Sequence, residues 1–413
     1  MNVQQITTSA RKTGNWFALA ALAVTFFGVG VTEFISIGIL PGVANDFGVS
    51  ISTAGLIVSM YALGVAVGGP ILTSLTAKLN RKRVLLAMIV LFIIGHFITA
   101  IAPVFSLVLA GRVLSAFSHG VFFALGSTVA ANLVPQNRRG SAIAFVFGGF
   151  TIATAIGAPL GTYLSEIFGW RLPFYGITLI GIIALVLNAV AIPDIKRSTG
   201  IPPSFKEQLK LITTGRILLV LAITIIGYGG TFATFTYLSP ILRKLTGYGG
   251  TAISFILFLY GVAIAVGNHF GGRLGNDKPV HALFYIFLVQ AVILLLFTFT
   301  APSKTLGLIN VIAMGLLAFM SVPVLQAYVL TLAERYAPSA VDFASSLNIA
   351  SFNGGIALGA YIGGVVADGI GLQHTSWMAA VMVGLGALLT LGSMKLENKH
   401  IREQGNETDR PAQ

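Results

Sequence analysis

The chain has 413 residues, of which 55% are hydrophobic and 9% are charged, and its 25 Lys and Arg outnumber its 13 Asp and Glu. A soluble domain carries roughly a quarter of charged residues, so this composition excludes an ordinary soluble protein and indicates one built into a membrane. The complete absence of cysteine excludes disulfides, thiolate catalysis and cysteine-based metal sites.

Long apolar runs recur from Trp16 almost to Met394. A membrane-spanning helix needs about 20 predominantly apolar residues, so the runs predict an all-α, polytopic membrane protein with twelve spans in two six-helix halves. The first six spans are expected near residues 16–40, 50–75, 83–102, 104–131, 140–165 and 172–192. The other six are expected near residues 217–240, 251–272, 280–300, 305–332, 342–367 and 374–394.

The longest polar stretch between spans separates the sixth span from the seventh and divides the chain. We therefore expect an N-terminal half (14–195), a cytoplasmic linker (196–216), a C-terminal half (217–396) and a disordered cytoplasmic tail (397–413).

The net charge of +12 would suit a nucleic-acid-binding protein, but the positions of the basic residues indicate another cause. If both termini lie on one side of the membrane, most Lys and Arg fall on that side. The opposite side has only Arg171, Arg243, Lys244 and Lys304, and Arg112 lies inside a span. Because basic loops stay in the cytoplasm, we expect a multi-pass protein of the cytoplasmic membrane with both termini inside and no nucleic-acid partner.

Glu33 lies about halfway along the first apolar run. A charged group at that depth costs roughly 2.5–3.5 kcal/mol on insertion scales, and such residues are functional by default. Burial favours the protonated acid, whereas a nearby guanidinium favours the carboxylate. A protein that changes either influence between two conformations could load a proton at Glu33 on one side and release it on the other. A static structural role and direct binding of a cationic substrate remain alternatives.

His119 follows Arg112 by seven residues, which puts both on one face of the fourth span. Histidine titrates near neutral pH, which suits a proton relay. We expect Glu33, Arg112 and His119 to carry proton coupling, with hydrogen-bonded packing as the alternative for His119. The histidines show no zinc-site spacing, and neither metal nor cofactor is expected.

Two spans carry small residues at every fourth position. In span five these are Gly149, Ala153, Gly157 and Gly161, and in span eleven Ser351, Gly355, Gly359 and Gly363. Either ladder alone indicates close helix packing, whereas its recurrence six spans later indicates a repeat of the kind found in transporters. Small residues in span two (Gly64, Gly68) and span eight (Gly261, Ala265) predict close approach of the two halves.

Three motifs carry a resemblance to a known family. Gly148 through Gly161, with Gly157, Pro159 and Gly161, resembles the glycine-proline motif that marks antiporters. Arg112 through Gly120 resembles a span-four motif built on a buried arginine, and Thr32-Glu33-Phe34 with Leu40-Pro41 resembles the first span of arabinose, chloramphenicol and purine efflux permeases. Over nearly all of 15–395 the chain resembles the twelve-span drug:H⁺ antiporter branch of the major facilitator superfamily.

The resemblance implies a monomer in which spans one, four, seven and ten line a central cavity, with Glu33 and Arg112 paired directly or through water. One motif departs from the family pattern, Gly-x-x-x-Asp-Arg-x-Gly-Arg-Arg after span two. The corresponding residues are Thr73, Ala77, Lys78, Asn80, Arg81 and Lys82. The acidic residue and both glycines are missing, so Glu33 carries more of the proton hypothesis.

Aromatic and amide side chains of spans one, seven, ten and eleven are the expected substrate site, suited to amphipathic or aromatic compounds. They are Phe34, Tyr228, Phe232, Phe235, Gln326, Asn348 and Phe352. For any single aromatic residue the alternative is contact with lipid or a neighbouring helix.

The sequence therefore predicts proton-coupled efflux of a small organic solute or drug, with protons, the solute and the lipid bilayer as partners. An uncoupled sugar or nucleoside efflux facilitator and a non-transporting receptor or scaffold are the alternatives. An enzyme is not expected, because no HExxH, nucleophile elbow or phosphate-binding GxxxxGK[ST] sequence occurs.

Overall fold

The computed structural model describes residues 3–76, 79–135, 139–193, 211–274 and 278–408. Within these residues, 12 helices are long and apolar enough to cross a membrane, which confirms the predicted all-α class. The N-terminal half consists of α1 (Val3–Phe47), α2 (Ile51–Thr76), α3 (Arg81–Ile101), α4 (Phe105–Asn132), α5 (Arg139–Phe168) and α6 (Arg171–Ala191). Most of the predicted linker and the altered loop motif at Ala77 and Lys78 lie outside the described residues.

The C-terminal half is more broken than the N-terminal half. It consists of α8 (Gly215–Ile223), a π-helical turn η2 (Thr224–Tyr228), α9 (Gly229–Phe235), α10 (Leu238–Lys244), α11 (Gly250–Leu274), α12 (Pro279–Thr300), α13 (Lys304–Ala318), α14 (Ser321–Tyr336), η3 (Pro338–Ala340), α15 (Val341–Gly369), η4 (Leu372–His374) and α16 (Thr375–Thr408). Helix α16 includes residues 397–408, where the sequence analysis expects disorder. Lys, Glu, Arg and Gln are strong helix formers, and they continue the helix beyond its apolar part.

Proline explains where spans seven and ten break. Proline has no N–H for the carbonyl four residues earlier, and its ring displaces that carbonyl. Pro240 therefore interrupts the helix at Thr236, and α9 ends at Phe235. Pro323 interrupts it at Phe319, whose carbonyl instead accepts from the N–H of Val322 at 3.1 Å.

Each half is held together by a glycine ladder against its own first span. A Cβ atom on Gly157 would meet the Phe34 side chain at 3.0 Å, and one on Gly161 would meet the Ile35 carbonyl at 2.8 Å, so α5 lies against α1. In the other half, a Cβ on Gly355 would meet the Ile225 carbonyl at 2.8 Å, and α15 lies against α9 in the same way. The two predicted ladders thus occupy equivalent positions in the two halves.

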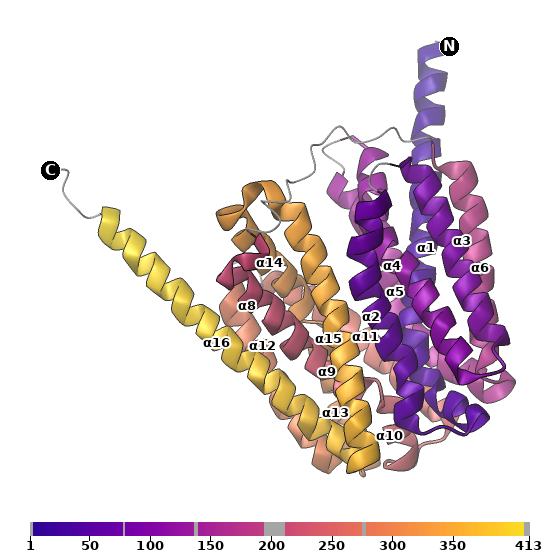
Figure 1. Ribbon diagram of the computed structural model, residues 1–413, viewed down its shortest axis with the longest axis vertical. Coiled ribbons are helices and arrows are strands. Elements are labelled where there is room, and N and C mark those ends of the chain that lie inside the picture. Colours follow the sequence, from indigo (N-terminus) through magenta and orange to yellow (C-terminus); the bar gives the residue numbers. More distant parts are fainter. Residues whose placement is uncertain (1–2, 77–78, 136–138, 194–210, 275–277, 409–413) are drawn as a thin grey trace.

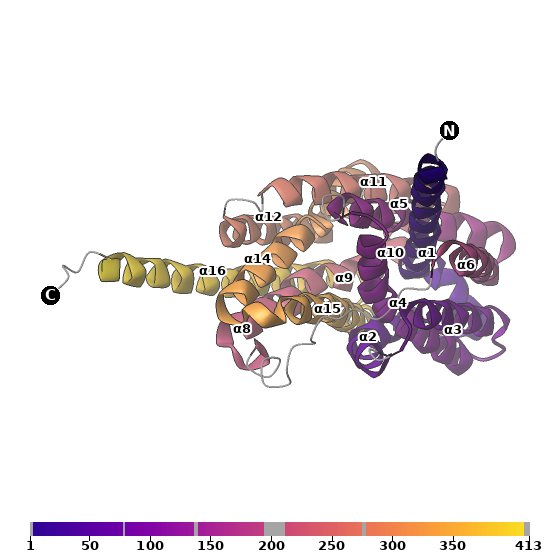
Figure 2. The ribbon, with the colours of Figure 1, turned by 90° about the horizontal axis from the view of Figure 1, so that it is seen from above.

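The halves lie side by side and meet through α2 with α15 and α5 with α11 (Figures 1 and 2). The prediction for span two was wrong in its partner: Gly64 and Gly68 face Ala116 and Phe117 of α4, in their own half. The small residues on α2 let α4 pack closely against it, because both helices surround the same buried side chains. Gly261 does meet the other half, where a Cβ would touch the backbone of Ala155 in α5.

The hydrogen bond and the ion pair that join the halves within the described residues lie at the end opposite the termini. There Ser50 donates to Asp368 at 2.7 Å, and Arg243 forms an ion pair with Glu166. The Tyr237 hydroxyl packs between Gly55 of α2 and Gly364 of α15 and donates to the Ala360 carbonyl at 2.8 Å. Helices α2 and α15 converge toward this end, whereas α16 slopes away from the N-terminal half toward the C-terminus (Figure 1). The protein is therefore closed at the end opposite the termini.

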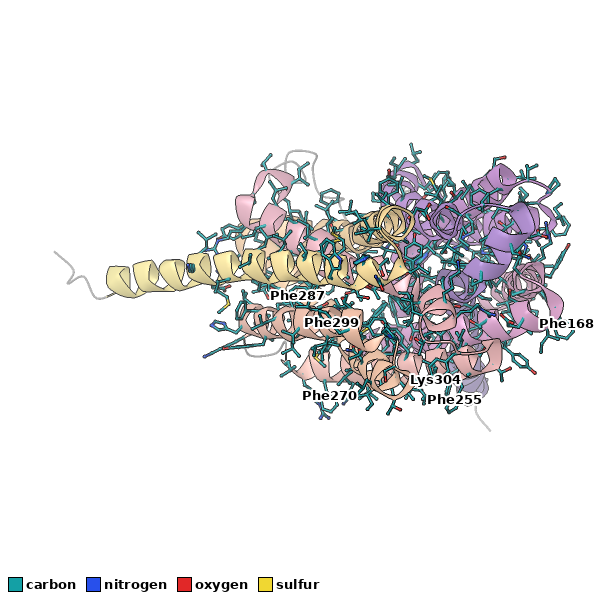
Figure 3. The ribbon with its side chains drawn as sticks, turned by 90° about the horizontal axis from the view of Figure 1, so that it is seen from below. Phe168, Phe255, Phe270, Phe287, Phe299 and Lys304 are labelled. Carbon is teal, nitrogen blue, oxygen red and sulfur yellow. The ribbon has the colours of Figure 1, made fainter. Side chains whose placement is uncertain are left out.

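Large apolar side chains cover the outside of the bundle. Phe168 and Phe270 lie at its rim (Figure 3) and are 65% and 48% exposed. An exposed apolar surface of this extent fits a hydrocarbon environment and not water.

Two glycines of α15, one inside the ladder and one outside it, test the ladder. We expect Gly359→Ala to lower the free energy of unfolding by about 1–3 kcal/mol, because its Cβ would overlap the Gly229 carbonyl oxygen. Gly354→Ala, whose Cβ would meet nothing within 4 Å, is the matched control and should leave stability unchanged or slightly raised. Thermal unfolding of the detergent-purified variants measures both, and equal effects would contradict the ladder.

Candidate functional site

Arg112 is fully buried in α4 and is bonded to two other helices. Its Nε donates to the Ile57 carbonyl of α2 at 3.2 Å. One terminal nitrogen donates to the Thr32 hydroxyl of α1 at 2.7 Å, and the other donates to the Thr32 carbonyl at 3.2 Å. A buried guanidinium stays charged, so these acceptors replace the water that it loses.

Aromatic faces supply further stabilisation for the same charge. The Arg112 guanidinium lies 3.9 Å from the ring centre of Tyr61 and 5.9 Å from that of Phe174. Both distances are within the range of a cation–π contact. The Tyr61 hydroxyl is bonded to Nδ1 of His119 at 3.1 Å. His119, predicted as a relay, is thus joined to Arg112 through Tyr61.

Thr32 also connects Arg112 to α3. The Thr32 hydroxyl lies 2.5 Å from Nε2 of His96, and Nδ1 of His96 lies 2.7 Å from the Phe92 carbonyl. Thr32 and His96 are both fully buried. The buried polar network therefore joins α1, α2, α3 and α4 through Thr32, Tyr61, His96, Arg112 and His119.

Glu33 is partly exposed, whereas Thr32 and Phe34 beside it are buried. The residues one turn away on its own face, Val29 and Ile37, are buried as well. The ion pairs of the described chain, Arg171–Asp46 and Arg243–Glu166, do not include it. The Arg112 guanidinium is bonded to Thr32 and not directly to the carboxylate, although the two charges interact electrostatically.

An aromatic cluster spans the boundary between the two halves. The Phe34 ring lies 5.8 Å from Phe319 and 6.4 Å from Phe235 of the other half. Tyr228 lies 5.5 Å from Phe319, 5.4 Å from Phe232 and 4.9 Å from Phe352. Phe150 and Tyr260 complete the cluster beside Phe34 and Phe235. Its members are Phe34, Phe150, Tyr228, Phe232, Phe235, Tyr260, Phe319 and Phe352.

In the chain, Glu33 lies between Thr32 of the buried polar network and Phe34 of the aromatic cluster. Besides Arg112, its carboxylate interacts electrostatically with Tyr61 of the network and with Tyr228 of the cluster. It is therefore positioned to respond to a change in either.

The two predicted amides form a hydrogen-bonded chain in the C-terminal half. Thr224 donates to the Asn348 carbonyl oxygen, and the Asn348 amide donates to Gln326, each at 2.9 Å. Gln326 in turn donates to the Ser345 hydroxyl at 2.7 Å. Asn348 and Thr224 each precede a cluster ring, Phe352 and Tyr228, by four residues. The amide chain therefore lies about one helical turn from the cluster, on the side of the termini.

The structure brings together all seven residues predicted for the substrate site, five as rings and two as amides. Sequence reasoning missed Phe150 and Tyr260 as cluster members and Thr32, Tyr61 and Thr224 as hydrogen-bonding partners. Pro240 and Pro323 are visible in the sequence and predict breaks in spans seven and ten. The cluster rings Phe235 and Phe319 lie at these breaks, so the prolines could have indicated them. Of the glycine-proline motif, Gly157 and Gly161 pack on α1, whereas a Cβ on Gly148 would meet nothing within 4 Å.

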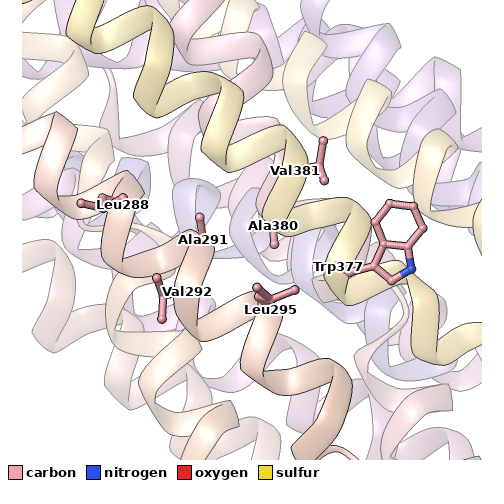
Figure 4. A pocket seen from close by; sticks show the side chains of 7 residues that line it. All are labelled: Leu288, Ala291, Val292, Leu295, Trp377, Ala380 and Val381. Carbon is pink, nitrogen blue, oxygen red and sulfur yellow. The ribbon is translucent and has the colours of Figure 1, made fainter.

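A different hollow lies on the outside of the C-terminal half (Figure 4). This groove of about 260 Å³ runs between α12 and α16 and is lined by Leu288, Ala291, Val292, Leu295, Trp377, Ala380 and Val381. Its lining is apolar and faces the hydrocarbon region, so it does not suit a polar solute.

Residues 22–340 match the family model described as Major Facilitator Superfamily. The chain belongs to this superfamily. Its members are membrane transporters and not enzymes, so the predicted class of protein is confirmed.

Individual members show how far this superfamily likeness extends. The chain is 52% identical to the uncharacterized MFS-type transporter YtbD of Bacillus subtilis, covering 96% of this chain and 100% of that one. It is 34% identical to a chloramphenicol resistance protein of Streptomyces lividans, covering 64% and 68%. It is 30% identical to a probable sugar efflux transporter of Helicobacter pylori, covering 89% and 92%.

The fold likeness within the superfamily extends to solved structures. A bacterial homolog of the human lysosomal transporter Spinster, in an inward-facing and unoccupied conformation, has a TM-score of 0.74 at 16% identity. The alignment covers 92% of this chain and 97% of that structure.

Tyr61 variants test how this superfamily member holds its buried charge. Tyr61→Leu removes the ring from the guanidinium and should lower the free energy of unfolding by about 2–4 kcal/mol. Tyr61→Phe keeps the ring and loses only the bond to His119, so we expect a loss of about 1 kcal/mol. Thermal unfolding compares the two, with Tyr285→Leu, at a tyrosine 62% exposed, as the control. Equal losses for Leu and Phe would show that the ring face contributes nothing.

Proposed function

We propose that this transporter exports a small organic solute across the cytoplasmic membrane in exchange for protons, with Glu33 as the proton-carrying group. The observation that carries the proposal is the position of Glu33. This partly exposed acid directly follows Thr32, which binds the buried Arg112, and directly precedes Phe34, whose ring contacts the other half. Ionisable groups at membrane depth that face a bundle interior serve proton and substrate pathways.

The proton is moved by changing what surrounds Glu33. When the guanidinium is held by Thr32, as here, it makes no direct bond to the carboxyl group, and Glu33 can hold a proton. When the cation approaches, the carboxylate is favoured and the proton leaves. For exchange, this release takes place while the protein is open toward the cytoplasm, and Glu33 takes up its proton while the protein is open outward. His119 supports this exchange through Tyr61, as the partner that orients the ring under Arg112.

The solute binds in the same region. The aromatic cluster offers ring faces for an aromatic or amphipathic compound, and the amide chain offers hydrogen bonds to its polar groups. Both discontinuous spans, seven and ten, break beside the cluster, as is common where transporters bind substrate near the midplane. Relatives named for chloramphenicol resistance and for probable sugar efflux support export as the direction of transport.

Alternating access follows from the contacts between the halves. With both termini in the cytoplasm, as the distribution of Lys and Arg favours, the closed end faces outward and this conformation receives solute from inside. Opening the outer end requires the contacts of Ser50 with Asp368 and of Arg243 with Glu166 to separate.

A second candidate is uncoupled efflux of a sugar or nucleoside, and the name of the Helicobacter pylori relative, a probable sugar efflux transporter, supports a sugar as solute. An imposed pH gradient separates the two candidates. In proteoliposomes, coupled exchange concentrates the solute against its gradient, whereas an uncoupled facilitator only equilibrates it.

Glu33→Gln tests the proton-carrying group. We expect a loss of at least about ten-fold in pH-driven transport with solute equilibration retained, because the amide cannot exchange a proton. Transport of chloramphenicol, a sugar and a nucleoside is measured in proteoliposomes with and without a pH gradient. Glu334→Gln, at the exposed end of α14, is the control and should behave as wild type. Unchanged pH-driven transport in Glu33→Gln would refute the proposal.

The natural absence of cysteine allows a direct test of alternating access. The pair Ser50→Cys and Asp368→Cys should cross-link under oxidation, because the two side chains are in hydrogen-bond contact. The cross-link should hold the outer end closed and reduce transport by at least about ten-fold, and a reductant should restore it. Full transport by the cross-linked protein would show that this end does not open.

A further inference from the structure

Elementary hydrogen-bond chemistry fixes the direction of each bond around Thr32. The Phe92 carbonyl can only accept, so Nδ1 of His96 carries a hydrogen. Arginine can only donate, so the Thr32 hydroxyl oxygen accepts from Arg112. The hydroxyl hydrogen of Thr32 is then directed to Nε2 of His96, which accepts in a neutral imidazole protonated at Nδ1. The order of donation is therefore Arg112 to Thr32 to His96 to Phe92.

In this order of donation, the hydroxyl and carbonyl oxygens of Thr32 form a binding site for the guanidinium, here called the Thr32 seat. Its hydroxyl and its carbonyl accept two of the three bonds that Arg112 makes, at 2.7 Å and 3.2 Å. His96 binds the hydroxyl hydrogen, which leaves the oxygen lone pairs facing the cation. The seat lies one residue before Glu33, and the guanidinium interacts electrostatically with that carboxylate without bonding to it.

We propose that Thr32, oriented by His96, is an alternative binding position for the Arg112 guanidinium, which moves between Thr32 and the Glu33 carboxylate as Glu33 gains and loses its proton. The inference rests on the proposed function, in which Glu33 carries the proton. Thr32 and His96 are then positioning residues that act through Arg112.

The physical reason is competition for one cation. When Glu33 is protonated it offers no charge, and the Thr32 and Ile57 acceptors together outweigh it. When Glu33 is ionised, charge attraction in a low-dielectric interior favours the carboxylate. Without the Thr32 seat, a desolvated guanidinium would have to stay on Glu33, and the proton could not return.

The other ionisable groups around the site are few. Those that interact electrostatically with Glu33 are Arg112 of α4, Tyr61 of α2 and Tyr228 of η2, and the charged group that acts on His96 is again Arg112. Arg112 is thus the charged group that changes position between the two states.

Thr32→Val and Thr32→Ser provide the test. Valine removes the hydroxyl at nearly constant shape, and the Thr32 and Ile57 carbonyls still hold the guanidinium, so the protein should fold. Freed from one bond, Arg112 favours the ionised Glu33, and more acid is needed to load the proton. We expect the pH of half-maximal pH-driven chloramphenicol transport to fall by about 0.5–1 unit in Thr32→Val, and Thr32→Ser to restore the wild-type profile.

His96→Phe and a control complete the set. His96 lies among Phe92 and Phe174, so phenylalanine fits there, and we expect a smaller shift in the same direction as Thr32→Val. Thr178→Val, which removes a buried hydroxyl bonded within its own helix, should leave the profile unchanged.

Two outcomes would overturn the inference. One is a wild-type profile in Thr32→Val, and the other is a lower rate at every pH with no shift, which would make Thr32 purely structural. If Glu33→Gln retains pH-driven transport, the proposed function itself fails. If Glu33→Gln loses that transport while Thr32→Val keeps the wild-type profile, the inference about Thr32 alone fails.

Discussion

A single positive charge that cannot leave the interior determines the arrangement of the N-terminal half. Arg112 requires acceptors from α1 and α2 and ring faces from α2 and α6, so these helices must approach α4 closely. Small residues make that approach possible: Gly64 of α2 faces Ala116 of α4, and glycines of α5 hold α1 in place. The ladders thus fix the distance at which the hydroxyl and carbonyl of Thr32 reach the guanidinium.

The two halves share an architecture but differ in chemistry. The N-terminal half contains the buried cation, the partly exposed carboxylate and the buried His96 and His119, whereas the C-terminal half contains the neutral chain of Thr224, Asn348, Gln326 and Ser345. The C-terminal half also carries the π-helical turn and both proline breaks. Rings from both halves meet between these two networks.

Hydropathy alone predicts the twelve spans, because burial in hydrocarbon demands long apolar helices whatever their neighbours. Hydropathy also marks Glu33 and Arg112 as candidate functional residues, because the free-energy cost of a charge within an apolar span can be read from the local sequence. The hydrogen-bond partners of Arg112 cannot be read from the local sequence. Thr32 and His96 show no special pattern there, and they become partners only when α1, α3 and α4 pack together. For the same reason the partner of Gly64 and Gly68 was assigned to the wrong helix, since spacing shows that a helix packs closely but not against which one.

The closure at the end opposite the termini includes a partly exposed ion pair. The side chains of Arg243 and Glu166 are 35% and 41% exposed, and ion pairs of that kind contribute about 0.2–1 kcal/mol. Dissolved ions screen such a pair, because the Debye length at physiological ionic strength is only about 8 Å. This ion pair alone therefore adds little more than thermal energy to the closed conformation, and a more saline medium weakens its contribution further.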